Sequence, residues 1–140
     1  MRYWDASAIV PLLVEEPRTA DARAALAEDA GIVTWWGTRV ECTSAIARLE
    51  RAAALTPRQA TQAIEVLRAI AAGWNEILPA EVARDTAGRL LRVHPLRAAD
   101  ALQLAAASVM AGGRPAEVGF VAFDDRLREA AGREGFLVGP

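Results

Sequence analysis

Short apolar runs alternate along this chain with longer segments in which apolar residues recur every three or four positions. Runs of the first kind are typical of buried strands, whereas the second spacing is typical of helices with one apolar face. Glycines and prolines, which favour turns, separate several of these segments. We therefore expect strands at residues 2–4, 32–36, 76–78, 119–123 and 136–138.

Helices are expected between these strands. Thr56 followed by Pro57 is a common helix start, and Gly112 follows a periodic segment as helix-ending glycines do. Pro11 lies within the first helical segment, so it must occupy a first turn or break that segment. The expected helical segments are residues 6–14, 18–29, 38–53, 57–74, 79–93, 97–110 and 124–133.

The alternation of strands and helices favours an α/β fold, in which a mostly parallel sheet lies between two layers of helices. A chain of 140 residues is most simply one domain, residues 1–140. At this size roughly 68–70% of the surface of the unfolded chain can be buried, so a real core is possible. We expect a three-layer α/β/α sandwich with about four to five short strands.

The composition of the chain indicates where in the cell we expect the protein to be. No apolar run approaches the ~18 residues of a membrane span, although 53% of the residues are hydrophobic. Asp5 interrupts the first apolar stretch, so we expect no signal peptide and a soluble, cytoplasmic protein. The single cysteine, Cys42, cannot form an internal disulfide and is interpreted as a buried structural thiol. The formal charge of −2 produces no overall attraction to nucleic acid.

Four acidic residues lie where a strand or short loop gives way to a helical segment: Asp5, Glu41, Asp100 and Asp124. Because the strand-to-helix turns of a parallel sheet emerge along one edge, these carboxylates can converge. Such a cluster repels itself unless cations, protons or arginines offset its charge. Mg²⁺ or Mn²⁺ suits a site of oxygen ligands, since the lone His94 has no companions. A metal held there can activate water for attack on phosphorus, so we expect phosphodiester hydrolysis.

Each of these acids also has a purely structural explanation. Asp5 and Asp124 can accept hydrogen bonds from the first amides of the helices that follow them. Thr38 with Glu41 fits a capping box, and Asp100 is favoured in a first turn by the helix dipole. Serine, threonine or asparagine would serve equally well as caps, so the recurrence of full acids favours a shared site. The two explanations are compatible.

Four segments around the acids are similar to the sequence motifs of a known family. They are YWDASAIV at residues 3–10, VE at 40–41 leading into a helix, LRAADALQLA at 96–105 and FDDRL at 123–127. In this order they resemble the motifs of PIN-domain ribonucleases, in particular the VapC-type toxins of bacterial type II toxin–antitoxin pairs. The resemblance spans the whole chain.

This resemblance implies a PIN-like sandwich and a Mg²⁺- or Mn²⁺-dependent endoribonuclease that acts on structured RNA such as tRNA or rRNA. It also implies a homodimer that a cognate VapB-type antitoxin neutralises. The residues that match the catalytic and metal-binding positions of the family are Asp5, Glu41, Asp100 and Asp124. Ser7 matches a polar position that supports the site.

One position departs from the family pattern. Ala122 stands where the family often has threonine or serine, so a hydroxyl that could orient an aspartate or a metal-bound water is missing. Asp125 could substitute for Asp124, although at a helix start its side chain should point elsewhere. Arg97 could reach a phosphate or the acids, or it could be a surface arginine that pairs with the charges of the helix start.

Other functions stay open at this point. A catalytically silent PIN-like module that binds RNA or a partner protein would keep the same fold and the same acids. A phosphoacceptor signalling domain also gathers acids at one sheet edge, but that class needs a lysine and this chain has none. Apolar residues of the first helix and of the hairpin between the third and fourth helices could form a dimer or antitoxin groove, or ordinary core. They are Ile9, Val10, Leu12, Leu13, Leu49 and Leu55.

Overall fold

The computed structural model describes residues 1–139 of the chain. Its strands are β1 (Arg2–Trp4), β2 (Ile32–Trp35), β3 (Asn75–Ile77), β4 (Gly119–Val121) and β5 (Leu137–Val138). They form one parallel sheet in the order β3-β2-β1-β4-β5. In the central strand, Tyr3 is paired with Val33 on one side and with Phe120 on the other. The first strand therefore lies at the middle of the sheet, and Asp5 follows it directly.

Helices connect every pair of consecutive strands. The first four are α1 (Ala6–Leu13), α2 (Thr19–Glu28), α3 (Thr38–Arg51) and α4 (Pro57–Ala71). The remaining ones are α5 (Glu81–Val93), α6 (Ala98–Ala111) and α7 (Asp125–Arg133), with a short 3-10 helix at Pro115–Glu117. Within the described residues, no helix has both the length and the apolar character needed to cross a membrane.

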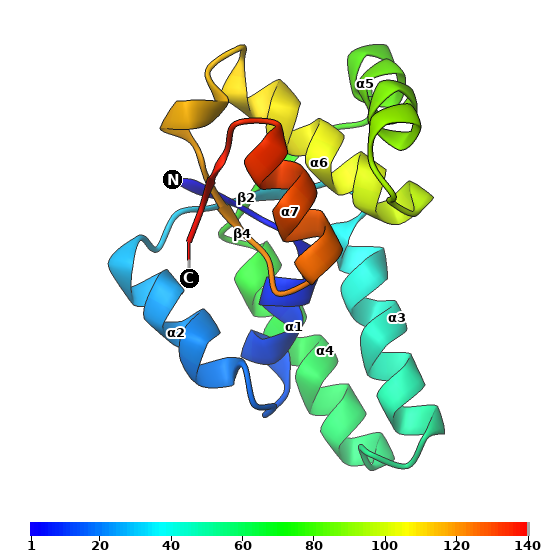
Figure 1. The fold of residues 1–140 in the computed structure, drawn as a ribbon. Helices are drawn as coiled ribbons and strands as arrows, with labels where there is room; N and C mark the ends of the chain where they lie inside the picture. Colours follow the sequence, from blue (N-terminus) through cyan, green and yellow to red (C-terminus); the bar gives the residue numbers. More distant parts are fainter. Residues whose placement is uncertain (140) are drawn as a thin grey trace.

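Two apolar cores lie on opposite faces of the sheet. Tyr3 and Phe120 stack with their ring centroids 5.3 Å apart and pack among residues of α5, α6 and α7. Trp4, the next residue along β1, points the other way and packs among residues of α1, α3 and α4. Figure 1 shows α5, α6 and α7 on one side of the sheet and α1 to α4 on the other. The alternation of side chains along β1 therefore separates the two helical layers.

The predicted sandwich is confirmed, with five parallel strands within the expected number. The strands are shorter than expected at three places, because β2, β4 and β5 each lose one or two residues at an end. Helix α1 continues through Pro11 to Leu13, so this proline lies beyond the first turn and does not break the helix there. Cys42 is a buried free thiol, as predicted. Pro140, the last residue of the expected domain, lies outside the described residues.

The apolar residues that were open to two interpretations are mostly core. Ile9 and Leu13 are buried, and Leu12 and Leu55 pack against the same core as partly buried residues. Val10 contributes both to this core and to the wall of a pocket. Leu49, which is partly buried, lines the same pocket.

Candidate functional site

A pocket of about 520 Å³ brings together the four acids that the sequence singled out. Asp5 follows β1, and Glu41 lies in the first turn of α3. Asp100 lies in the first turn of α6, and Asp124 immediately precedes α7. All four line the pocket together with Ser7. Of the other predicted site residues, Arg97 and Asp125 are outside the set of described residues that form its wall.

Asp5 is the most enclosed of the four, with 4% of its surface exposed. Its backbone N–H donates to the Val121 carbonyl at 2.9 Å, which fixes the end of β1 against β4. Its carboxylate accepts a 3.0 Å bond from the Ser7 amide, so the predicted helix cap is confirmed. The Ser7 hydroxyl in turn accepts from the Phe123 amide at 2.9 Å, which ties the start of α1 to the loop before α7.

Burial raises the pKa of Asp5 to about 6. Hydrogen bonds from Ser7 lower this pKa, and the nearby negative charge of Asp100 raises it. An ionised Asp5 is therefore held in a place where its charge is poorly solvated and is close to another negative charge.

Glu41 is half-buried and is held by an unexpected partner. The predicted capping box is wrong, because α3 begins after Gly37 without a side-chain cap and the Thr38 hydroxyl is buried in contact with Thr34. Glu41 instead accepts a 2.6 Å bond to its Oε2 from the side-chain amide of Gln103 on α6. Burial, followed by the charge of Asp5, raises the pKa of Glu41 to about 7, while the Gln103 bond lowers it.

The other two acids are more exposed and act as helix-terminal groups. Asp124 accepts a 2.9 Å bond from the Leu127 amide, which confirms the predicted cap of α7. Asp100 accepts a longer, 3.4 Å bond from the Arg97 amide. Burial raises the pKa of Asp100, the Arg97 amide lowers it, and the charge of Asp124 raises it. Since α6 follows helix α5, Asp100 reaches the pocket from the start of a helix that follows another helix, and not from the end of a strand.

The donor set of this pocket fits a hard divalent cation. All four acids supply carboxylate oxygens, and His94 is instead buried against Glu134 at 2.8 Å. Among residues 1–139, however, no three His, Cys, Asp or Glu side chains lie close enough together to form a ready-made metal site. The arrangement therefore fits an ion that is held by one or two carboxylates and completes its shell with water or substrate oxygens, as Mg²⁺ commonly does.

Two residues near the acids were missed by sequence reasoning. Arg48 lines the pocket two helical turns after Glu41, a spacing of seven residues that puts both on one face of α3. Gln103 is fully buried among the apolar residues of α6. A lone glutamine within a run of alanines and leucines was a visible signal of a buried polar contact, but the run alone does not identify its partner.

The structure also shows the surroundings of Ala122, the position that departs from the family pattern. It is fully buried in the core beneath α6 and α7, and its carbonyl accepts a 3.0 Å bond from Arg128. No side-chain hydroxyl is present at this position to orient Asp124. The Ser7 hydroxyl, which bonds the Phe123 amide, is the hydroxyl that contacts this loop.

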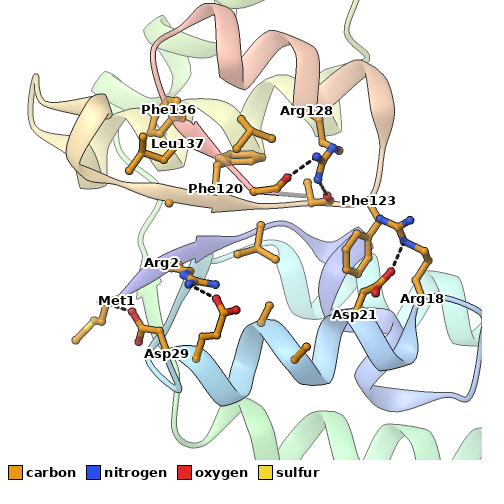
Figure 2. A pocket seen from close by; sticks show the side chains of 18 of the residues that line it. Met1, Arg2, Arg18, Asp21, Asp29, Phe120, Phe123, Arg128, Phe136 and Leu137 are labelled. Carbon is orange, nitrogen blue, oxygen red and sulfur yellow. Dashed lines mark hydrogen bonds and ion pairs between the residues drawn. The ribbon is translucent and has the colours of Figure 1, made fainter.

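A second, larger cavity of about 990 Å³ lies between α2 and the strands β4 and β5 (Figure 2). Its charged side chains are engaged with protein groups. Arg2 pairs with Glu28 at 2.7 Å, Arg18 lies 4.3 Å above the Phe123 ring, and Arg128 donates to the carbonyls of Ala122 and Gly139. None of the four predicted acids lines this cavity. The smaller pocket is therefore the better candidate for chemistry, despite its size.

Comparison with known proteins agrees with this fold. The model of the PIN domain family matches residues 2–133. No curated protein matches the chain. PIN domains are generally nucleases that depend on divalent metal ions. Because the match covers nearly the whole chain and the sheet is the expected parallel one, this protein belongs to the PIN domain family.

Proposed function

We propose that this protein is a Mg²⁺- or Mn²⁺-dependent endoribonuclease and the toxin of a VapBC-type toxin–antitoxin pair. One observation carries the nuclease proposal: acids from four separate segments line a single pocket of a PIN domain. The toxin assignment is supported by the resemblance of the four motifs to VapC-type toxins. The whole chain, residues 1–140, is then one PIN-like domain.

Asp5, Glu41, Asp100 and Asp124 are the residues from which the metal ion would take its one or two direct carboxylate ligands, and the others would contact it through water or substrate. A bound Mg²⁺ or Mn²⁺ supplies an activated water and stabilises the charge that develops on the phosphodiester oxygens. The carboxylates of Asp5 and Glu41 are fixed by hydrogen bonds from Ser7 and Gln103, so they need little rearrangement before they bind. Asp124 is exposed and fixed by one amide bond, so it lies at the mouth of the site.

The proposed substrate is RNA with an accessible, unpaired segment, as in the loops of tRNA or rRNA. The pocket is open to solvent at Asp124 and at Arg48, which is exposed on the wall. Among the described residues, no salt bridge joins Arg48 to a carboxylate, so its guanidinium is available to a phosphate. An unpaired strand can bring its backbone to such a pocket more easily than a regular helix can.

The proposed partners are a second copy of the chain and a VapB-type antitoxin. Several large apolar side chains are exposed and are therefore available to a partner surface, although isolated exposed apolar residues are also common in monomers. They are Trp36, Val40, Leu78 and Val82, at the ends of β2 and β3 and the starts of α3 and α5.

A direct test is brief expression of the wild-type protein and of Asp5→Asn, followed by sequencing of the new RNA ends. The wild type should create ends at defined positions, and Asp5→Asn should create few or none, because the carboxylate that is lost is the most enclosed one in the pocket. Purified wild type should cut the same RNA with Mg²⁺ or Mn²⁺ and stop on chelation. Undiminished cutting by Asp5→Asn would refute the proposed role of this pocket.

A second candidate function is a catalytically silent PIN-like module that binds RNA or a partner. The observation that favours it is the spacing of the acids, since no three metal-ligating side chains within the described residues form a ready-made site. It predicts RNA or antitoxin binding without new RNA ends in any metal. The same sequencing experiment therefore separates the two functions.

A further inference from the structure

A buried chain of side-chain hydrogen bonds leads from the centre of the sheet to Glu41. Tyr3 donates its O–H to Oε1 of Gln103 at 2.5 Å. The Nε2 of Gln103 bonds Thr38 Oγ1 at 3.0 Å and Glu41 Oε2 at 2.6 Å. Tyr3 and Gln103 are both fully buried, on β1 and α6. The pocket carboxylate is thus connected to two fully buried side chains.

The direction of every bond in this chain is determined. Thr34 uses its only hydroxyl hydrogen on the Trp4 carbonyl at 2.7 Å, so in the 2.7 Å contact between Thr34 and Thr38 the donor is Thr38. Thr38 then has only acceptor capacity left, which Gln103 fills with one N–H. The second N–H of Gln103 is left for Glu41. Each polar hydrogen has one acceptor, so the network has a single arrangement.

The opposite orientation of the Gln103 amide is excluded by the same count of hydrogen-bond donors and acceptors. A flip would place the Oε1 acceptor against the Glu41 carboxylate and against Thr38, whose hydrogen is already used. It would also place the N–H groups against the Tyr3 hydroxyl and remove the acceptor of that buried hydrogen. Two buried acceptors would then face each other, which is costly in a region shielded from water.

We propose that Gln103 is a positioning residue for Glu41: it engages Oε2 and leaves Oε1 as the oxygen that faces the pocket contents. This inference rests on the proposed function, because it assigns the free oxygen to the metal ion. Outer-shell hydrogen bonds of this kind orient a ligand before the metal arrives, and their loss commonly weakens metal binding by about 10–100-fold.

The test is Mn²⁺ titration of purified protein by calorimetry, without RNA, on four chains: wild type, Gln103→Met, Glu41→Gln and the double variant. Gln103→Met keeps the size of the side chain but removes both N–H groups. It should weaken Mn²⁺ binding by about tenfold or more. In the Glu41→Gln background the same change should alter the affinity by less than about twofold, because Gln103 acts through Glu41.

Tyr3→Phe is the matched control. It breaks the network on the side away from the pocket, while the bonds from Gln103 to Thr38 and Glu41 stay in place. It should lower thermal stability, as Gln103→Met does, yet change Mn²⁺ affinity by less than about twofold. A merely structural role for Gln103 predicts the opposite result, in which both variants weaken Mn²⁺ binding in proportion to the stability that they lose.

The remaining outcomes are equally decisive. If Glu41→Gln weakens Mn²⁺ binding and Gln103→Met does not, or does so equally in both backgrounds, the role of Gln103 is refuted while the proposed function stands. If the wild type does not bind Mn²⁺ and Glu41→Gln gives the same titration as the wild type, the metal site and the role of Gln103 are both refuted. If circular dichroism shows that Gln103→Met does not fold, Gln103→Asn replaces it in the test. Asparagine is shorter by one methylene, so its amide is withdrawn from Glu41, and this variant must also weaken Mn²⁺ binding.

Discussion

The inner and the outer acids of the pocket are held in different ways. Of the inner acids, Asp5 is buried and Glu41 is half-buried, and burial raises their pKa values to about 6 and about 7. All four acids sit at helix starts, but Asp100 and Asp124, the outer acids, are more accessible, and Asp124 is exposed to solvent. A helix start gains stability from an exposed acid, whereas an enclosed carboxylate with a raised pKa reduces stability at neutral pH. The inner acids are therefore the ones whose presence a structural role explains least.

The largest expected effect is a difference in RNA cleavage between the two pairs. Glu41→Gln should lower the cleavage rate by on the order of 10³-fold, because the Glu41 charge is half-buried and held in place by Gln103, so water replaces it poorly. Asp124→Asn should lower it by about tenfold, since water can reach this exposed position and take the place of the carboxylate oxygen. Single-turnover cleavage of one RNA with Mn²⁺ in excess measures both rates under the same conditions.

Asp125→Asn is the matched control for this comparison. Asp125 is the neighbour of Asp124 in the sequence, but it is not among the described residues that line the pocket. Its change should leave the rate within about twofold of the wild type, as expected for a surface acid away from the reacting groups. Equal losses for Glu41→Gln and Asp124→Asn would remove the distinction between inner and outer acids.

Much of the fold, and the acids themselves, could be predicted from sequence because they depend on local patterns. The apolar runs gave five strands, and the caps at Asp5 and Asp124 follow from the residue types at helix starts. The capping box at Thr38 was predicted by the same local logic and is wrong. There the hydroxyl is drawn into the core by Thr34 and Gln103, and a long-range contact overrides the local preference.

The part of the site that the sequence did not reveal consists of contacts between distant segments. Gln103 and Glu41 are 62 positions apart, and Gln103 and Tyr3 are 100 apart. Periodicity identifies the helix that carries Gln103 but not which polar group that side chain meets across the sheet. The pairing depends on how α6 packs against β2 and on where α3 begins after that strand, which only the assembled fold determines.

An intermediate effect concerns the stability of the metal-free protein. Asp5→Asn should raise the free energy of unfolding by about 1–3 kcal/mol at pH 8, because the pKa of Asp5 is raised from 3.8 to about 6 by burial. The asparagine oxygen can still accept the Ser7 amide bond that caps α1. Urea unfolding in the presence of a chelator measures the difference between the two chains.

The pH dependence of that difference identifies its cause. Between pH 3.8 and about 6 the unfolded chain has lost the Asp5 proton while the folded chain retains it, so the wild type loses stability as the pH rises through this window. Below it, Asp5 is neutral in both states and the penalty is absent. The advantage of Asp5→Asn should therefore shrink as the pH falls from 8 toward 4. If the stability advantage of Asp5→Asn over the wild type stayed constant with pH, packing and not the buried charge would be its cause.

The smallest expected effect separates the two roles of Asp124. Asp124→Ala removes the cap of α7 and should cost about 1 kcal/mol of unfolding free energy, whereas Asp124→Ser keeps a capping oxygen and should cost only a few tenths. Both variants lack the carboxylate, so both should weaken Mn²⁺ binding to the same extent if Asp124 is a ligand. Urea unfolding and Mn²⁺ titration on the two variants give the answer. If the serine variant binds Mn²⁺ like the wild type, Asp124 is a cap alone and the site consists of the other three acids.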